Sequence, residues 1–104
     1  MRAGSKSDLI MFYTYVLLSL KDDKRYIGFT EDLKKRIEEH DLGLVDSTKS
    51  RRPFELVYYE ACRNKDDAIK REKYFKTGFG RRFLKERLKG DLAPVAQLDR
   101  ASVS

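Results

Sequence analysis

The sequence FYTYVLLSLKDDKRYIGFT, residues 12–30, carries the clearest secondary-structure pattern of the chain. Residues 12–19 are rich in aromatic and aliphatic side chains that favour strands. A polar segment at residues 21–24 predicts a turn, and residues 25–29 then predict a second strand. Together these segments predict a β-hairpin.

The hairpin is expected to bring two tyrosines together. Side chains alternate between the faces of a strand, so a turn with an even number of residues would place Tyr15 and Tyr26 on one side of the sheet. Gly28 shares that face of the second strand, and glycine inside a strand often marks the close approach of another group. A strand rich in tyrosine is common in ordinary sheets, so these residues gain meaning only in combination with others.

A helix is predicted over residues 31–42, directly after the hairpin. Thr30 is a suitable N-cap for this helix, and Glu31 and Asp32 would lie in its first turn. Gly43 is expected to end the helix, because glycine readily adopts the conformation that follows a last turn.

The second half of the chain predicts one strand and two helices. Residues 54–61 (FELVYYEA) predict a third strand, and Asn64 is expected to cap a helix over residues 65–76. The glycines of residues 78–80 predict a break before a last helix over residues 81–88. The order ββαβαα predicts a small α+β domain, in which helices flank a three-stranded antiparallel sheet.

The length of 104 residues fits one domain. We expect this domain over residues 12–89, with a flexible leader over residues 1–11 and a disordered or loosely packed tail over residues 90–104. No apolar run approaches the ~20 residues of a membrane span, so we expect no membrane association. The single cysteine, Cys62, excludes an internal disulfide, and the sequence favours a cytoplasmic protein.

The positive charge is concentrated in one segment. The whole chain carries a formal charge of +6, and residues 63–89 alone contain 11 basic and 4 acidic residues. Such a block is typical of a surface that binds a polyphosphate such as a nucleic acid. A solvated helical surface would give the same pattern, so both interpretations remain open on charge alone.

Glu72 interrupts the apolar face of the helix predicted over residues 65–76. It lies four residues after Ala68 and three before Phe75, so it falls on or beside that face. A buried carboxylate must be paired, protonated or bound to a metal. A salt bridge to Arg71 or Lys76 is one interpretation, and a metal ligand is the other, because hard divalent cations prefer carboxylate oxygen.

Arg36 and His40 share a face of the first predicted helix, since they are four residues apart. A single histidine is usually a surface or helix-end residue, and an arginine beside an apolar stripe often only extends to solvent. Phosphodiester hydrolysis, however, needs a proton acceptor, a cation at the phosphate and help for the leaving oxygen. Tyr15, Tyr26, Arg36, His40 and Glu72 could together supply these groups.

These residues occur in the order and spacing of a known family. The segment 13–72 resembles the GIY-YIG nuclease superfamily, and is most similar to its small, single-domain bacterial branch. Residues 26–28 (YIG) form the second half of the signature, and residues 13–15 (YTY) match the first half only in their last tyrosine. Residues 30–36 and 68–72 are similar to the helices that carry the family's arginine and glutamate.

The resemblance implies a ββαβα core and a metal-dependent DNA endonuclease that uses one metal ion. Tyr15 would accept a proton from the attacking water, directly or through Tyr26, and Arg36 would steady the phosphate. Glu72 would hold a single Mg²⁺ or Mn²⁺. His40 would hydrogen-bond the phosphate or serve as an alternative base.

The expected partner is DNA, and RNA remains open. The residues expected to contact nucleic acid are Gly28, Lys49, Arg51, Arg52, Lys76, Arg81 and Arg82. No base-reading motif is present in the sequence, so we expect low sequence specificity. A role in DNA repair or recombination fits such an activity, and a monomer and a weak homodimer both remain open.

Two other functions use the same charge. One is a nucleic-acid-binding module with a weak or inactive site, and the other is a small interaction protein that binds an acidic partner. Glu72 favours a nuclease over these two functions, because a surface that only binds phosphate should avoid a carboxylate.

Overall fold

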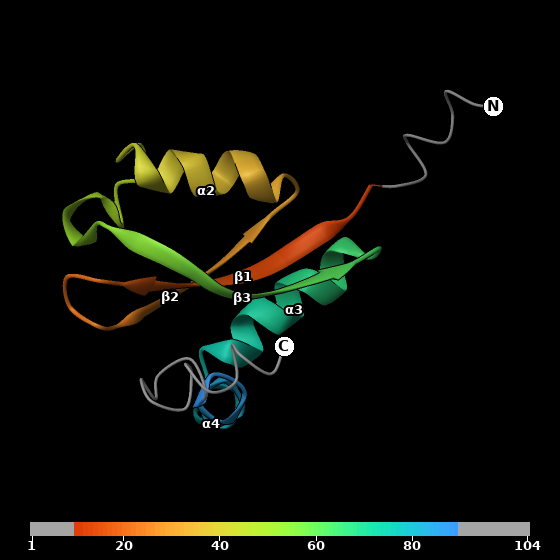
Figure 1. The fold of residues 1–104 in the computed structure, drawn as a ribbon. Helices are drawn as coiled ribbons and strands as arrows, with labels where there is room; N and C mark the ends of the chain where they lie inside the picture. The colour runs from red at the N-terminus through yellow and green to blue at the C-terminus, as the bar shows by residue number, and fades with distance from the viewer. Residues whose placement is uncertain (1–9, 90–104) are drawn as a thin grey trace, which may run out of the picture.

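The computed structural model describes residues 10–89 as a three-stranded antiparallel sheet with helices on both faces (Figure 1). The strands are β1 Phe12–Ser19, β2 Arg25–Thr30 and β3 Phe54–Cys62, in the spatial order β2-β1-β3. The helices are α2 Leu33–Asp41, α3 Lys65–Phe75 and α4 Gly78–Arg87, with a short 3₁₀ helix, η1, at Lys49–Arg51. The chain order ββαβαα confirms the predicted α+β fold class.

The central strand β1 is buried on both sides. Helix α2 covers one face of the sheet, and α3 and α4 lie on the other (Figure 1). On the second face, the hydroxyl of Thr14 donates to the carbonyl oxygen of Ala68 at 2.7 Å, which ties α3 to β1. Val16, two residues along, packs with Phe75 in the main core. Tyr15 alternates with these residues and therefore faces α2.

The hairpin register places the two tyrosines on one face. Tyr15 is paired with Gly28, and Leu17 with Tyr26. The last paired positions are Leu18 and Arg25, so six residues, 19–24, lie between them. The turn is therefore even, and the expectation that Tyr15 and Tyr26 share a side of the sheet is confirmed.

The main core lies between the sheet and the two C-terminal helices. Its buried members are Val16, Phe75, Leu84 and Leu88. Arg71 closes the edge of this core, because its guanidinium lies 4.7 Å from the ring centroid of Phe75. Leu84 of α4 and Leu88 directly after it thus point into this core.

The start of α2 differs from the sequence-based expectation. The N-cap is Asp32 and not Thr30, because the Asp32 carboxylate accepts the backbone N–H of Lys35 at 3.1 Å. The Thr30 hydroxyl instead accepts the N–H of Asp32 within the preceding turn. Gly43 follows the helix with a φ of 77°, a conformation that favours glycine, as predicted.

The predicted break at residues 78–80 is wrong, because these residues form the first turn of α4. Thr77 caps this helix by accepting the backbone N–H of Gly80 at 3.1 Å. The predicted cap of α3 is confirmed, since the Asn64 side chain accepts the N–H of Asp67 at 3.0 Å.

The predicted leader and tail lie outside the described residues, apart from residues 10 and 11. Within residues 10–89, no helix has both the length and the apolar character needed to cross a membrane. The cytoplasmic location stays a prediction.

Candidate active site

A buried chain of hydrogen bonds connects the hairpin to α2 and the loop after it. The Tyr15 Oη atom lies 2.8 Å from Nε2 of His40, and His40 Nδ1 lies 2.7 Å from Oγ1 of Thr48. All three side chains have no solvent exposure. Strand β1, helix α2 and the loop before η1 each contribute one member, so the chain exists only in the folded domain.

The hydrogen-bond inventory gives this chain a direction. The Thr48 hydroxyl lies 3.4 Å from the carbonyl oxygen of Val45 and 2.7 Å from Nδ1 of His40, so when it donates to Val45 it can accept an Nδ1–H from His40. A neutral imidazole protonated on Nδ1 has its lone pair on Nε2, where it accepts the Tyr15 O–H. His40 is therefore positioned to take the proton of Tyr15.

Burial keeps both rings uncharged at neutral pH. It raises the pKa of Tyr15 to about 12, and the Arg36 guanidinium opposes this rise. Burial also lowers the pKa of His40 below its ordinary value of 6.5, and Arg36 lowers it further. The site thus holds a neutral phenol next to a neutral imidazole.

Aromatic rings surround His40. Tyr26 approaches it edge-on with 5.2 Å between ring centroids, and its own ring lies 6.4 Å from that of Tyr15. Phe54, at the start of β3, approaches the imidazole at 6.2 Å. The structure therefore brings Tyr15, Tyr26 and His40 together as one cluster.

Gly28 provides the space for the Tyr15 ring. A Cβ atom at this position would lie 2.4 Å from both Cζ and Oη of Tyr15, which is closer than real contacts allow. The close approach predicted at this glycine thus comes from the ring across the strand pair. Its predicted contact with nucleic acid stays a prediction.

Arg36 lies one helical turn before His40. Its Nη1 donates to Oε1 of Glu39 at 2.9 Å, and 35% of its side chain is exposed. The same guanidinium raises the fraction of ionised Tyr15 at a given pH, because it acts to lower the pKa of that hydroxyl. Arg36 therefore combines a position beside Tyr15 with access to an anion from solvent.

Glu72 is a partly buried carboxylate of α3. Its Oε2 accepts a hydrogen bond from Nζ of Lys76 at 3.0 Å, and 22% of its side chain is exposed. Of the two partners considered for it, Lys76 is the one observed, because Arg71 pairs with Glu60 at 2.8 Å. The pKa of Tyr15 is raised mainly by burial, then by Tyr26, and to a smaller extent by the negative charge of Glu72. Glu72 is therefore within electrostatic range of the Tyr15 hydroxyl.

The donor set around Glu72 is suited to a hard cation held mainly by substrate and water. Residues 10–89 contain no group of three or more histidine, cysteine, aspartate or glutamate side chains that could enclose a metal ion. Mg²⁺ does not need such a cage, since it commonly binds one or two carboxylates and completes its shell with phosphate oxygens and waters. The partly exposed carboxylate of Glu72 fits this mode of binding.

Three of the basic residues predicted to contact nucleic acid stabilise the loop before β3. Arg51 pairs with Asp22 at 2.8 Å, and Lys49 pairs with Asp46 at 3.5 Å. Arg52 donates to two backbone carbonyls at 3.0 and 3.2 Å. Their contacts with nucleic acid stay predictions, and the structure gives each of them an intramolecular partner.

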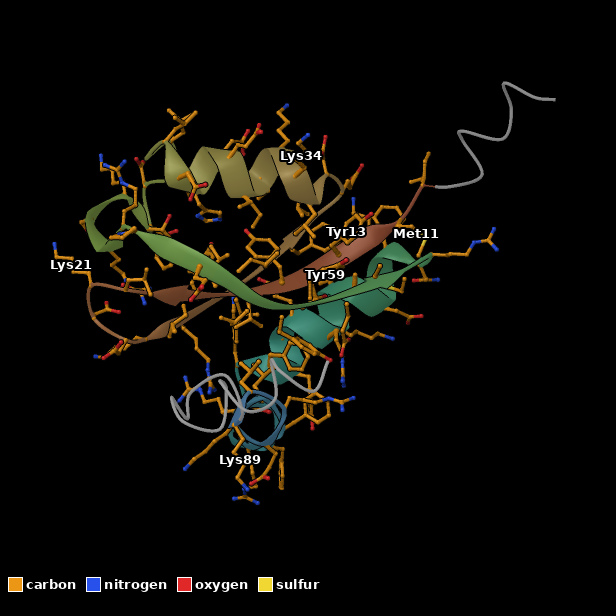
Figure 2. All side chains as sticks on the ribbon, in the orientation of Figure 1. Met11, Tyr13, Lys21, Lys34, Tyr59 and Lys89 are labelled. Carbon is orange, nitrogen blue, oxygen red and sulfur yellow. The ribbon has the colours of Figure 1, made fainter. Side chains whose placement is uncertain are left out.

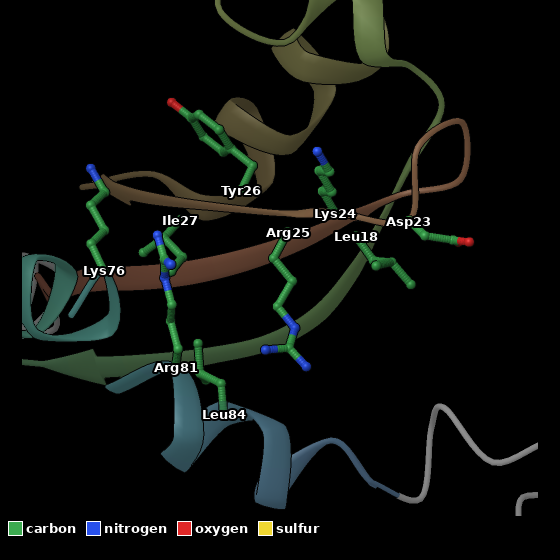
Figure 3. A pocket seen from close by; sticks show the side chains of 9 residues that line it. All are labelled: Leu18, Asp23, Lys24, Arg25, Tyr26, Ile27, Lys76, Arg81 and Leu84. Atoms are coloured by element: carbon green, nitrogen blue, oxygen red, sulfur yellow. The ribbon is translucent and has the colours of Figure 1, made fainter. Parts of the chain in front are cut away.

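The other predicted basic residues lie between β2 and α4. Lys76 and Arg81 line a pocket of about 690 Å³, and Arg82 lines an adjoining hollow of about 550 Å³ (Figure 3). Arg25 lines both, although the sequence analysis did not select it. The sequence carried no signal for it, because the free edge of the sheet on which it lies is revealed only by the strand order.

Thr48 was not among the residues predicted from the sequence. This residue lies in an irregular polar loop, where no periodicity marks an inward side chain. Only the packing of that loop against α2 reveals its contact with His40.

Comparison with known proteins identifies the family of the chain. Residues 11–86 match the family model of the GIY-YIG catalytic domain. A UPF0213 protein of Clostridium perfringens is 43% identical over 67 residues, which are 64% of this chain and 71% of that protein. A UPF0213 protein of Lactiplantibacillus plantarum is 38% identical over 77 residues, covering 71% and 75% of the two chains.

A solved structure is also similar in sequence. The NMR structure of a UPF0213 protein from Bacillus halodurans shares 31% identity, covers 74% of this chain and 84% of its own, and superposes with a TM-score of 0.47. The GIY-YIG domain is in general a nuclease-type domain. With the family model spanning residues 11–86 and both signature tyrosines on one face of the hairpin, the chain belongs to the GIY-YIG family.

Proposed function

We propose that this chain is a metal-dependent endonuclease that hydrolyses phosphodiester bonds of DNA with low sequence specificity. The observation that carries the proposal is the buried Tyr15–His40–Thr48 chain, which ends beside Arg36 and Glu72. A domain that only bound phosphate would need neither a histidine aimed at a tyrosine nor a carboxylate facing it.

The proton of the attacking water follows the hydrogen-bond chain in this proposal. Tyr15 gives its proton to Nε2 of His40 and receives a proton from the water, directly or through Tyr26, as the new P–O bond forms. His40 is completely buried, so we assign it to this role and not to contact with the phosphate. Thr48 keeps Nε2 free to accept by holding the proton on Nδ1.

The charges of the site are assigned to the phosphate. Arg36 would neutralise a non-bridging oxygen, since its guanidinium is partly exposed beside Tyr15. Glu72 would hold a single Mg²⁺ or Mn²⁺, whose chemistry is to stabilise negative charge on the leaving oxygen. Lys76, which pairs with Glu72, would then lie near the same group.

The basic surface supports a nucleic-acid substrate. Lys76, Arg81 and Arg82 come from the strongly basic segment of residues 63–89, and they gather on one side of the molecule with Arg25. No sequence motif for reading bases accompanies them, which favours contacts with the backbone. DNA as the substrate in preference to RNA, a role in repair or recombination, and the oligomeric state stay predictions.

The direct test is cleavage of end-labelled single-stranded, duplex and branched DNA in Mg²⁺, in Mn²⁺ and in EDTA. We expect cleavage with a divalent cation and none in EDTA, and a loss of at least ~100-fold in Glu72→Gln. The matched control is Glu38→Gln, which removes an exposed carboxylate of α2 and should cleave normally. Equal cleavage by Glu72→Gln and wild type, or undiminished cleavage in EDTA, would contradict the proposal.

A further inference from the structure

The pocket between β2 and α4 is lined mainly by cations and apolar side chains. Its volume is about 690 Å³, and the adjoining hollow of about 550 Å³ shares Arg25 and Arg81 with it. The cations of the two are Lys24, Arg25, Lys76, Arg81, Arg82 and Lys85, against the carboxylates of Asp23 and Glu86. A concave surface of one charge sign attracts ligands of the opposite sign.

Arg25 and Arg81 enter this space from opposite walls. Figure 3 shows Arg25 extending from β2 toward α4, and Arg81 rising from α4 toward β2. Both side chains lie between the same two elements and line both hollows. Two guanidinium groups that line the same space are both available to the phosphates of a strand bound there.

Arg25 lacks the carboxylate partner that two other partly buried arginines of the domain have. Arg51 pairs with Asp22 and Arg71 with Glu60, whereas no carboxylate of residues 10–89 lies within ion-pair distance of Arg25. The Arg25 side chain is partly buried, and this burial lowers the pKa of its guanidinium. Keeping an uncompensated charge in such a place costs free energy, and a bound anion would recover it.

The pocket borders the candidate active site through two of its lining residues. Tyr26 lines the pocket and also packs against His40, with 5.2 Å between ring centroids. Lys76 lines it as well and pairs with Glu72. A strand whose scissile phosphate lies at Glu72 would therefore pass a neighbouring phosphate into this pocket.

We propose that Arg25 and Arg81 form a second phosphate site, which binds the backbone of the nucleic-acid strand next to the scissile phosphate. The proposal rests on the proposed function for the identity of the strand. It assigns Arg25 a substrate-binding role and gives the strand a path from Tyr26 along the free edge of β2 to α4.

The test measures binding of a short fluorescein-labelled DNA by anisotropy in EDTA, where no cleavage is expected. We expect Arg25→Gln and Arg81→Gln each to weaken binding roughly tenfold and to reduce the slope of log K against log salt by about one. Because both groups would hold one phosphate, Arg25→Gln combined with Arg81→Gln should weaken binding by less than the product of the two single effects.

Matched variants separate this site from general charge. Arg63→Gln removes the same charge from an exposed position after β3, at the other end of the sheet, and should leave affinity within about twofold. Arg25→Lys keeps the charge but loses the two-pronged geometry, and should bind between wild type and Arg25→Gln. Thermal unfolding of each variant confirms that the fold is retained.

The outcomes distinguish this proposal from the proposed function. Equal affinities of Arg25→Gln and Arg63→Gln, or losses that simply multiply in the double variant, would overturn the second phosphate site even if the protein cleaves DNA. Displacement of the DNA by millimolar inorganic phosphate would also overturn it, because the pocket would then be a site for free phosphate. Binding that depends on Arg25, in a protein that does not cleave, would support the site and count only against hydrolysis.

Discussion

The proton order along Tyr15, His40 and Thr48 depends on one hydroxyl group, that of Thr48. When its hydrogen is donated to Val45, the hydroxyl has only acceptor capacity toward His40. The proposed chemistry needs this order, because a histidine protonated on Nε2 could not accept the proton of Tyr15. Thr48, which would not itself contact the substrate, therefore controls whether His40 can accept the proton of Tyr15 in the proposed mechanism.

His40 is the only histidine of the chain, so its tautomer can be measured directly by NMR with ¹⁵N-labelled imidazole. We expect the neutral form to carry its proton on Nδ1 in the wild type. Thr48→Val keeps the size of the side chain but removes the acceptor, so the Nε2–H form should become populated. Thr48→Ser should restore the wild-type spectrum, whereas an Nε2–H tautomer in the wild type would contradict the proposed direction.

The residues of the site differed in how well the sequence revealed them. Tyr15 and Tyr26 could be placed on one face from strand periodicity and an even turn alone. Thr48 and Arg25 could not, because the first reaches His40 through an irregular loop and the second depends on which strand forms the edge. Local patterns predict the faces of regular elements, and tertiary packing determines the rest.

At the scale of elements, the joint between α3 and α4 depends on Gly80. A Cβ atom there would lie 2.0 Å from the carbonyl oxygen of Tyr74 and 2.6 Å from the Cα of Phe75. The glycines of residues 78–80 predicted a break because glycine disfavours helix interiors. Gly80 instead allows α4 to pack directly against the end of α3, which brings Arg81 to the pocket.

Gly80→Ala should therefore lower the free energy of unfolding by about 1–3 kcal/mol, since the clashing atoms belong to the backbone and cannot rotate away. Gly78→Ala is the matched control in the same turn, where an added Cβ meets no atom within 4 Å. It should be neutral or stabilising by about 0.4–1 kcal/mol. Urea unfolding of both variants checks this, and equal effects would contradict the role of Gly80.

The helix caps show why element boundaries were harder to predict than the elements themselves. Thr30, Asp32 and Asn64 are all good capping residues by type. The strand β2 runs on to Thr30, so the first helix begins only after Asp32. Residue type identifies a possible start, and the length of the preceding strand determines which one is used.

At the scale of the whole molecule, the fold gives the two faces of the sheet different tasks. The face toward α2 holds the Tyr15–His40 pair, and the other face carries α3 and α4 with most of the excess positive charge (Figure 1). Glu72 lies on α3, on the second face, but its charge contributes to the raised pKa of Tyr15 on the first. The candidate site therefore forms where both layers meet the edge strand β2.

The stability of the whole domain should depend on the protonation of His40. Its pKa in the folded state is lowered from 6.5 by burial and by Arg36, while Glu39 and Asp41 oppose this change. A group with a lowered folded pKa contributes stability above its unfolded pKa, and that contribution is lost as pH falls below 6.5 toward the folded value. We expect the melting temperature to fall between pH 7 and pH 5, and His40→Gln to reduce this fall. An unchanged pH dependence in His40→Gln would show that His40 does not control it.

The hydroxyl of Tyr15 is the group on which the proposed hydrolysis depends, and Tyr13 provides a matched comparison. Tyr13 lies on the same face of β1, but it is partly exposed and packs 6.1 Å from the ring of Tyr59 (Figure 2). The decisive measurement is the rate of DNA cleavage in Mg²⁺ by Tyr15→Phe and Tyr13→Phe at saturating enzyme. We expect Tyr15→Phe to lose at least ~100-fold and Tyr13→Phe to stay within about twofold of wild type. Cleavage by Tyr15→Phe at the wild-type rate would contradict the assignment of Tyr15 as the group that accepts the proton of water.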